Sequence, residues 1–244
     1  MDALSVNSNE MAGSSVAQRL MIHKVLLIGG IVSSLVYVAI NIFGAMQFEG
    51  YSSFSQTVSE LIAIGAPSRS LVVQLMLVYG ILICAFGVGI WMSAGRKRAL
   101  CIAAILIVAK EVLGAVVTLF FPIHLRGVAG MMTDTMHGIL TSVGVFLFMF
   151  PAMGLGASAF GKRFRFYSIA TMLIFIICGV LTFLDASALG ANLPTLWMGV
   201  WERINIFGYL LWCDVLSINL IRALPNNLRL ADRKKSLPAE KVTK

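Results

Sequence analysis

Six apolar stretches follow one another along the chain and are separated by short polar segments. A hydrocarbon core about 30 Å thick is crossed by about 20 apolar residues in a helix. The stretches run over residues 22–45, 71–92, 99–121, 134–153, 167–183 and 204–224. This pattern predicts an all-α polytopic membrane protein whose fold is a six-transmembrane-helix bundle.

Prolines indicate where some of these helices end. Pro122 and Pro225 directly follow the third and sixth stretches. Because proline lacks an amide donor and disfavours helix in the residue before it, we expect both helices to end there. Pro151 lies near the end of the fourth stretch, and we expect it to kink or end that helix.

The segment between the first two stretches has its own pattern. Ser53 and Gln56 resemble a helix-capping box, and the apolar residues Phe54, Val58 and Leu61 share one helical face. Gly65, followed by alanine and proline, ends the segment. We predict a short amphipathic helix in this first outer loop, lying on or dipping into the membrane surface.

Composition and charge narrow the class and set the topology. The chain is 59% apolar and 12% charged, which excludes a disordered chain, a coiled coil and an ordinary soluble enzyme. Fifteen of its 19 Lys and Arg residues fall on one side of the expected membrane and three on the other. The positive-inside rule then predicts that both termini lie in the cytoplasm.

The net charge of +8 could indicate nucleic-acid binding, but most of the basic residues lie on the expected cytoplasmic side of the membrane. Topology therefore explains the charge, and we expect no nucleic-acid partner. The domain organisation follows as a cytoplasmic N-terminal tail at 1–21, the transmembrane domain at 22–224, and a basic cytoplasmic C-terminal tail at 225–244.

Three ionisable residues fall in the middle of expected spans, where charge is costly. Lys110 and Glu111 lie in the third span and Asp214 in the sixth. Lys110 and Asp214 are expected at similar depth and could pair, whereas adjacent Lys110 and Glu111 point in different directions on a helix. The group is either a structural charge pair or a proton or ion relay.

A second set of polar residues is expected toward the outer face. Each span contributes or adjoins at least one of them, so they could converge on one outward-facing pocket. The set comprises Asn41, Glu60, Gln74, His124, Asp134, His137, Asp185, Glu202 and Arg203. As ligand-binding residues we select Ser59, Glu60, Gln74, Asp185, Glu202 and Arg203.

The chemistry of this set leaves alternatives open. Asp134 and His137 share a helix face, and with His124 they could bind a divalent metal such as zinc. Alternatively Asp134 caps the fourth span and His137 makes an interhelical hydrogen bond. As candidate catalytic residues we select His137, Asp134 and Glu60. His137 could also act as a base for Ser59 across the pocket, although no local pattern supports that pair.

The run SFSQTVSELIAIGAPS at 53–68 resembles the first-loop signature of a prokaryotic membrane family known as domain of unknown function 998. Phe121-Pro122, His137-Gly138 and the Trp-Glu-Arg triplet at 201–203 are similar to further features of that family, in the same order. Members commonly carry an acidic residue where this chain has His124. The resemblance covers 22–224 and implies a six-helix membrane protein without implying an activity. More loosely, the chain is similar to membrane-embedded metal hydrolases that act on lipids.

Two classes of function fit these observations. The first is binding or transport of a small or lipid-like solute in an outward-facing pocket, with Lys110, Glu111 and Asp214 coupling protonation to movement. The second is a membrane-embedded hydrolase or transferase, metal-dependent or using His137 as base, that acts on a lipid headgroup. An accessory role with purely structural polar groups is a third reading. Membrane lipids are the expected partners, together with a small-molecule or lipid ligand, and a homo-oligomer remains open.

Overall fold

The computed structural model describes residues 2–128 and 131–235 and confirms the six-span, all-helical architecture. Three spans are single helices of moderate length, and two lie in longer helices that run toward the termini. The fourth span is built from three consecutive helical segments. The elements are α1 (Asp2–Met46), α2 (Arg69–Ala94), α3 (Arg98–Phe120), α4 (Met132–Val143), η2 (Gly144–Met149), α5 (Phe150–Ser158), α6 (Lys162–Gly190) and α7 (Met198–Lys235).

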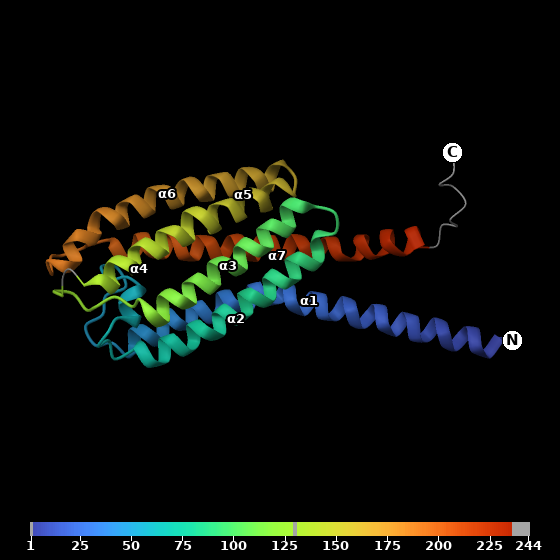
Figure 1. The fold of residues 1–244 in the computed structure, drawn as a ribbon, viewed down its shortest axis with the longest axis horizontal. Coiled ribbons are helices and arrows are strands. Elements are labelled where there is room, and N and C mark those ends of the chain that lie inside the picture. The colour runs from blue at the N-terminus through green and yellow to red at the C-terminus, as the bar shows by residue number, and fades with distance from the viewer. Residues whose placement is uncertain (1, 129–130, 236–244) are drawn as a thin grey trace.

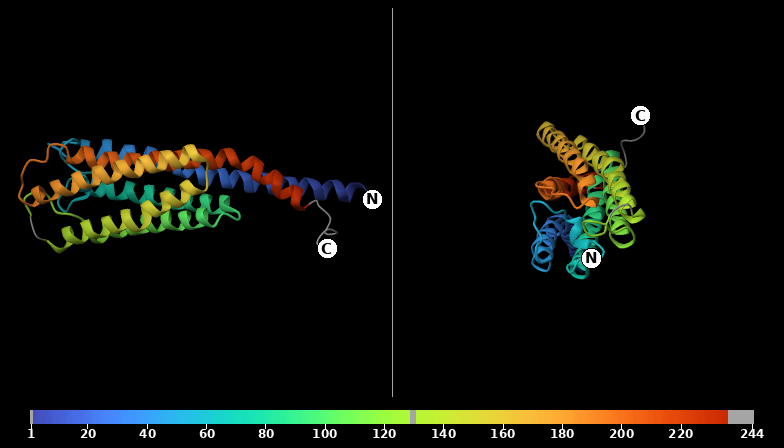
Figure 2. Two further views of the ribbon diagram at one scale, coloured as in Figure 1. Left: turned by 90° about the horizontal axis from the view of Figure 1, so that it is seen from above. Right: turned by 90° about the vertical axis from the view of Figure 1, so that its left-hand side faces the viewer.

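The helices form an elongated bundle (Figure 1). The N-terminal end of α1 and the C-terminal end of α7 lie together at one end of this bundle. We call this the terminal end and the opposite end, which carries the long connections, the loop end. Helix α1 packs against α2 and α7, α2 against α3, α3 against α5, and α6 against α7. A short connection at the terminal end joins the fourth span to α6, and from there the two diverge toward the loop end (Figure 2, left).

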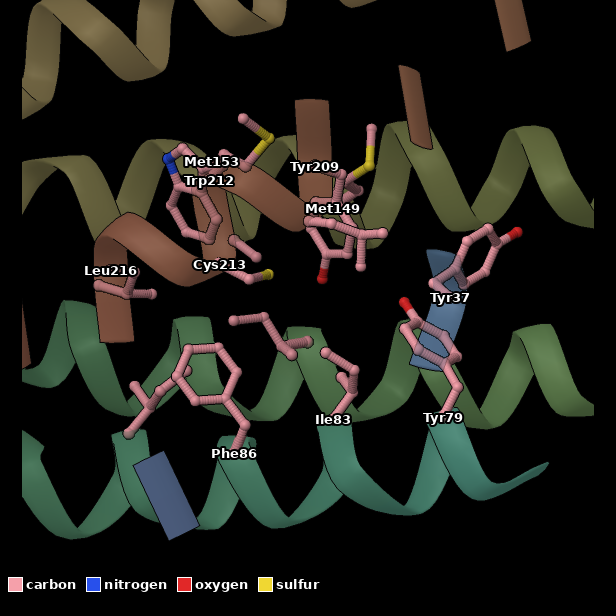
Figure 3. Packing of buried hydrophobic residues seen from close by; sticks show 14 of the residues in the cluster. Tyr37, Tyr79, Ile83, Phe86, Met149, Met153, Tyr209, Trp212, Cys213 and Leu216 are labelled. Carbon is pink, nitrogen blue, oxygen red and sulfur yellow. The ribbon is translucent and has the colours of Figure 1, made fainter. Parts of the chain in front are cut away.

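The best-packed part of the bundle lies in its terminal half. Trp212 is fully buried there, and its indole N–H donates to Ser168 Oγ at 2.8 Å. Phe86 and Leu216 face the same core from α2 and α7 (Figure 3). A tryptophan buried in this way needs a partner for its one donor, and Ser168 supplies it.

The fourth span shows how Pro151 is accommodated. Pro151 cannot donate to the carbonyl four residues earlier, and the residues directly before it, Gly144–Met149, take π-helical hydrogen bonding. The helix then continues to Ser158, so Pro151 distorts the span without ending it.

The other two prolines behave differently from each other. Helix α3 ends at Phe120, as Pro122 predicts. The expectation that Pro225 ends the last helix is wrong, because α7 continues to Lys235. The apolar span itself still stops at Leu224, so the carbonyl that the proline leaves free, that of Ile221, lies in the last turn of the span.

Candidate functional site

The first loop of the loop end is buried between helices. Its only helical element is η1, a single 3₁₀ turn at Ser59–Ile62. Val58, Leu61 and Ile62 are buried, whereas Phe54 is 64% exposed. The predicted short amphipathic helix, lying on or dipping into the membrane surface, is therefore corrected to a single buried turn. The segment is drawn inward because side chains of α7 and of the second loop supply partners for its backbone.

Arg203 at the start of α7 holds the first half of this loop. Its guanidinium donates to the carbonyl oxygens of Ser53 at 2.7 Å and Gln56 at 2.8 Å, and to Asn41 Oδ1 at 3.0 Å. It also donates to the Tyr51 hydroxyl at 2.6 Å. The five donors of one arginine thus fix α1, the loop and α7 together.

Tyr51 passes this anchoring on to the next part of the loop. Its hydroxyl donates to the carbonyl oxygen of Thr57 at 2.7 Å. Burial raises the pKa of Tyr51, and the nearby Arg203 opposes that shift only in part. The phenol therefore stays protonated and remains able to donate while it accepts from Arg203.

Glu202, the neighbour of Arg203, binds the second half of the loop. Its carboxylate accepts a short hydrogen bond from the backbone N–H of Val58 and lies 3.2 Å from Ser59 Oγ. Helix α7 therefore holds the loop with a cation on one residue and an anion on the next.

A buried ion pair joins the first loop to the second. Arg126 Nε lies 2.6 Å from Glu60 Oε1, and the Glu60 side chain is only 2% exposed. Glu60 also accepts from the backbone N–H of Thr57 at 2.7 Å. Arg126 further donates to Thr195 Oγ1 at 2.8 Å and to the carbonyl oxygen of Ser55 at 2.6 Å. All three connections of the loop end thus meet at Arg126.

The two histidines of this region have different partners. His124 Nδ1 lies 3.1 Å from Asp134 Oδ1, and the His124 backbone N–H donates to the same oxygen at 2.7 Å. His137 Nδ1 lies 2.8 Å from the carbonyl oxygen of Phe121, and its Nε2 lies 3.2 Å from Ser59 Oγ.

This arrangement corrects the predicted metal-ligand set of His124, Asp134 and His137. Across the described residues, no three His, Cys, Asp or Glu side chains are placed to hold one metal ion. Asp134 and His137 share a helix, but Asp134 turns to His124, whereas His137 points toward the first loop. Asp134 lies in the first turn of α4, where an acidic residue suits the helix dipole, but its carboxylate bonds to His124 and makes no side-chain cap of the helix.

A cavity of about 1660 Å³ lies beside these polar groups. Its walls come from α2, α3, α4, η2, α6 and α7 and are mostly apolar. It occupies the loop half of the bundle, where α6 and the fourth span diverge (Figure 2, left). Ser59, Glu60, Arg126, His137 and Glu202 line it at the loop end.

The charged residues of α3 line the same cavity farther from the loop end. Lys110 Nζ lies 2.7 Å from Glu111 Oε1 and 4.6 Å from the ring centre of Tyr209. The Tyr79 hydroxyl donates to Glu111 Oε1 at 3.1 Å. The long lysine side chain reaches its neighbour, so the adjacent residues do pair, contrary to the expectation from their directions.

Asp214 is not the partner of Lys110. It accepts a hydrogen bond from Ser34 of α1 at 2.8 Å and is not among the residues that line the cavity. The expected pairing of Lys110 with Asp214 is therefore wrong. Three of the residues selected for ligand binding also lie apart from the cavity: Gln74 is exposed on α2, and Asp185 and Arg203 are not part of the cavity wall.

Comparison with protein families identifies one match over most of the bundle. Residues 31–219 match the family described as "Protein of unknown function (DUF998)". The chain belongs to the DUF998 family. No curated protein and no solved structure matches this DUF998 chain. Its activity is therefore argued from the site alone.

Some site residues of this DUF998 protein were missed from sequence. Arg126, Thr195 and Tyr51 are central to the loop network, although none of them is among the candidate residues predicted above. The sequence does hold an indication for Arg126, because it is one of three Lys or Arg residues on the side of the expected membrane opposite the basic one. A buried Glu60 needs such a partner.

Proposed function

We propose that this protein binds an amphipathic, lipid-like molecule in the cavity of its loop half, with the polar part of the ligand near the loop network. The observation that carries the proposal is the cavity itself, about 1660 Å³ with mostly apolar walls and polar residues grouped at one end. A site of this kind suits a ligand with a long apolar part and one polar group.

The position of the cavity supports entry from the membrane. Its lining includes Ile139, Val143 and Phe146 on the fourth span and Ile176, Val180 and Phe183 on α6. These two spans meet at the terminal end and diverge toward the loop end (Figure 2). An acyl chain can therefore reach the cavity between them without leaving an apolar environment.

An unpartnered polar atom supports a polar contact inside the cavity. Asn205 lies on the α7 wall, and its Oδ1 is buried without a hydrogen-bond partner among the described residues. Buried acceptors are nearly always satisfied, so this amide oxygen favours a ligand with a hydroxyl or amino donor.

The topology of the proposal follows from charge. With both termini in the cytoplasm of a bacterial inner membrane, the loop end and the polar part of the cavity face outward. The ligand would then come from the outer leaflet. Movement of the ligand across the membrane, with Lys110 and Glu111 changing protonation, is an extension of this proposal and not a requirement of it.

Cavity filling tests the proposal. Gly114 on α3 lines the cavity, and a side chain added there meets open space. Gly114→Phe should project a ring into the cavity and lower retention of co-purified lipid at least about tenfold, which corresponds to about 1.4 kcal/mol. Native mass spectrometry of protein extracted in a mild detergent measures the retained lipid.

Gly154→Phe is the matched control. Gly154 also has open space around it but lies on α5 outside the cavity lining. The proposal expects lipid retention in this variant to equal that of the wild type. Equal retention in Gly114→Phe, or no bound lipid in the wild-type protein, would contradict it.

A further inference from the structure

The geometry around Ser59 points to an activity: we infer that Ser59 is a nucleophile, with His137 as its general base, toward acyl esters of a lipid bound in the cavity. The inference rests on the proposed function because the cavity must deliver the ester. It adds a reaction and a substrate class to a binding site.

The first step of the argument is the state of the His137 ring. Its Nδ1 lies 2.8 Å from the carbonyl oxygen of Phe121, which can only accept a hydrogen bond. Nδ1 therefore carries the proton, and Nε2 of the neutral ring has a free lone pair. That lone pair faces Ser59 Oγ at 3.2 Å. A base oriented by a third group and within hydrogen-bond reach of a hydroxyl is the arrangement that activates serine.

The second step is access to the ligand. Ser59 and His137 both line the cavity, and Ser59 lies on η1, whose position is fixed by Glu202 and by the Glu60–Arg126 ion pair. Sites for covalent chemistry need such a rigidly held nucleophile beside a water-poor cavity.

Glu202 is the other group in contact with Ser59. Its Oε1 lies 3.2 Å from Ser59 Oγ, so the single hydroxyl proton can be donated to Glu202 or to His137. Glu202 also accepts from the backbone of Val58. We assign Glu202 as a positioning residue that holds Ser59 and its loop, and His137 as the base.

The reaction balances with water as co-reactant. Ser59 Oγ bonds to the ester carbonyl carbon while His137 Nε2 takes the hydroxyl proton. The bond from that carbon to the alcohol oxygen breaks, and the alcohol leaves with the proton from His137. Water then attacks the acylated serine, giving the fatty acid and restoring Ser59.

The test uses a long-chain alkyl fluorophosphonate on the detergent-extracted full chain. Serine attack at phosphorus expels fluoride and leaves a permanent adduct, which intact-mass and peptide mass spectrometry locate. We expect labelling at Ser59 in the wild type, none in Ser59→Ala, and a rate lower by about 100-fold or more in His137→Ala. His137→Gln, which keeps a polar side chain, should lose labelling in the same way and guards against misfolding of the alanine variant.

Two further variants define the assignment. Ser158→Ala removes a serine outside the cavity lining, whose hydroxyl donates to the Leu155 carbonyl, and should label as the wild type does. Glu202→Gln keeps an acceptor for Ser59 but removes the charge that positions it, and should slow labelling less than the His137 variants do. Loss in Glu202→Gln together with normal labelling in both His137 variants would overturn the assignment of the base.

The outcomes separate this inference from the proposed function. Retained lipid without a Ser59 adduct overturns the nucleophile and leaves lipid binding intact. A Ser59 adduct without retained lipid in any preparation contradicts the proposed binding function. Labelling that persists in Ser59→Ala overturns the inference as well.

Discussion

At the scale of single residues, the loop end depends on charges that are buried and fully partnered. Glu60 is buried and pairs with Arg126, and Arg203 donates to α1, to the first loop and to the Gly199 carbonyl of α7. Sequence reasoning selected Glu60, Glu202 and Arg203 because charges beside apolar spans need a reason. It could not find their partners, since these are mostly backbone carbonyls and N–H groups whose positions depend on how the loop folds.

Removal of one member of the buried ion pair should unfold the loop end. Arg126→Ala leaves Glu60 buried without its cation, which costs about 3–5 kcal/mol. Thermal unfolding in detergent should show a midpoint lower by about 10 °C, given about 2–4 °C per kcal/mol for a chain of this size. Arg163→Ala, at an exposed arginine of α6, is the control and should change the midpoint little. An unchanged midpoint in Arg126→Ala would show that the pair does not stabilise the fold.

Gly199 tests the contact between the loop and α7. A Cβ at this position would collide with the carbonyl oxygens of Ser53 and Gln56, which accept from Arg203. Gly199→Ala should therefore destabilise the protein by about 1–3 kcal/mol. Gly161→Ala, where a Cβ meets open space, should not. Faster proteolysis of the first loop in Gly199→Ala would report the same loss, and equal proteolysis of both variants would count against it.

At the scale of elements, the six spans were predictable because each apolar stretch has to satisfy its own backbone in lipid. What hydropathy could not predict is where the spans separate. The divergence of α6 from the fourth span depends on side-chain packing in the terminal half, which Trp212 and its neighbours decide. The first-loop segment differs from its prediction for a related reason, because most of its apolar side chains are buried within the protein and not at the membrane surface.

Variants of the Lys110–Glu111 pair of α3 can distinguish a structural role of this pair from a functional one. If Lys110 and Glu111 only stabilise the fold, Lys110→Met should be destabilising by leaving Glu111 without its cation, and the Lys110→Met/Glu111→Gln double variant should regain most of that loss. We expect this recovery in the thermal midpoint, together with lipid retention near the wild-type level. Recovered stability with lost lipid retention would instead assign the pair to ligand binding.

At the scale of the whole molecule, the bundle has a buried core around Trp212 in its terminal half and a cavity of about 1660 Å³ in its loop half. The asymmetry matches the charge distribution, with basic residues gathered at the terminal end and the polar network at the loop end. If the cavity binds a ligand as proposed, the polar contacts of that ligand lie on one side of the membrane. We expect that side to be the outer one.

Reporter fusions test this orientation. In a bacterial host, alkaline phosphatase fused after residue 193, in the connection between α6 and α7, should be active, because the enzyme folds only outside the cytoplasm. The same enzyme at the C-terminus should be inactive, and a fluorescent protein there should fluoresce. The reversed pattern would invert the topology and place the cavity toward the cytoplasm.

The central claim, that a lipid-like molecule enters the cavity between α6 and the fourth span, is tested most directly by photolabelling in vesicles. A phospholipid with a diazirine in its acyl chain is activated in the reconstituted protein, and adducts are located by peptide mass spectrometry. The account predicts adducts on cavity residues such as Val112, Leu140 and Val180, and their loss in Gly114→Phe but not in Gly154→Phe. Adducts confined to residues outside the cavity, or cavity adducts unchanged in Gly114→Phe, would contradict it.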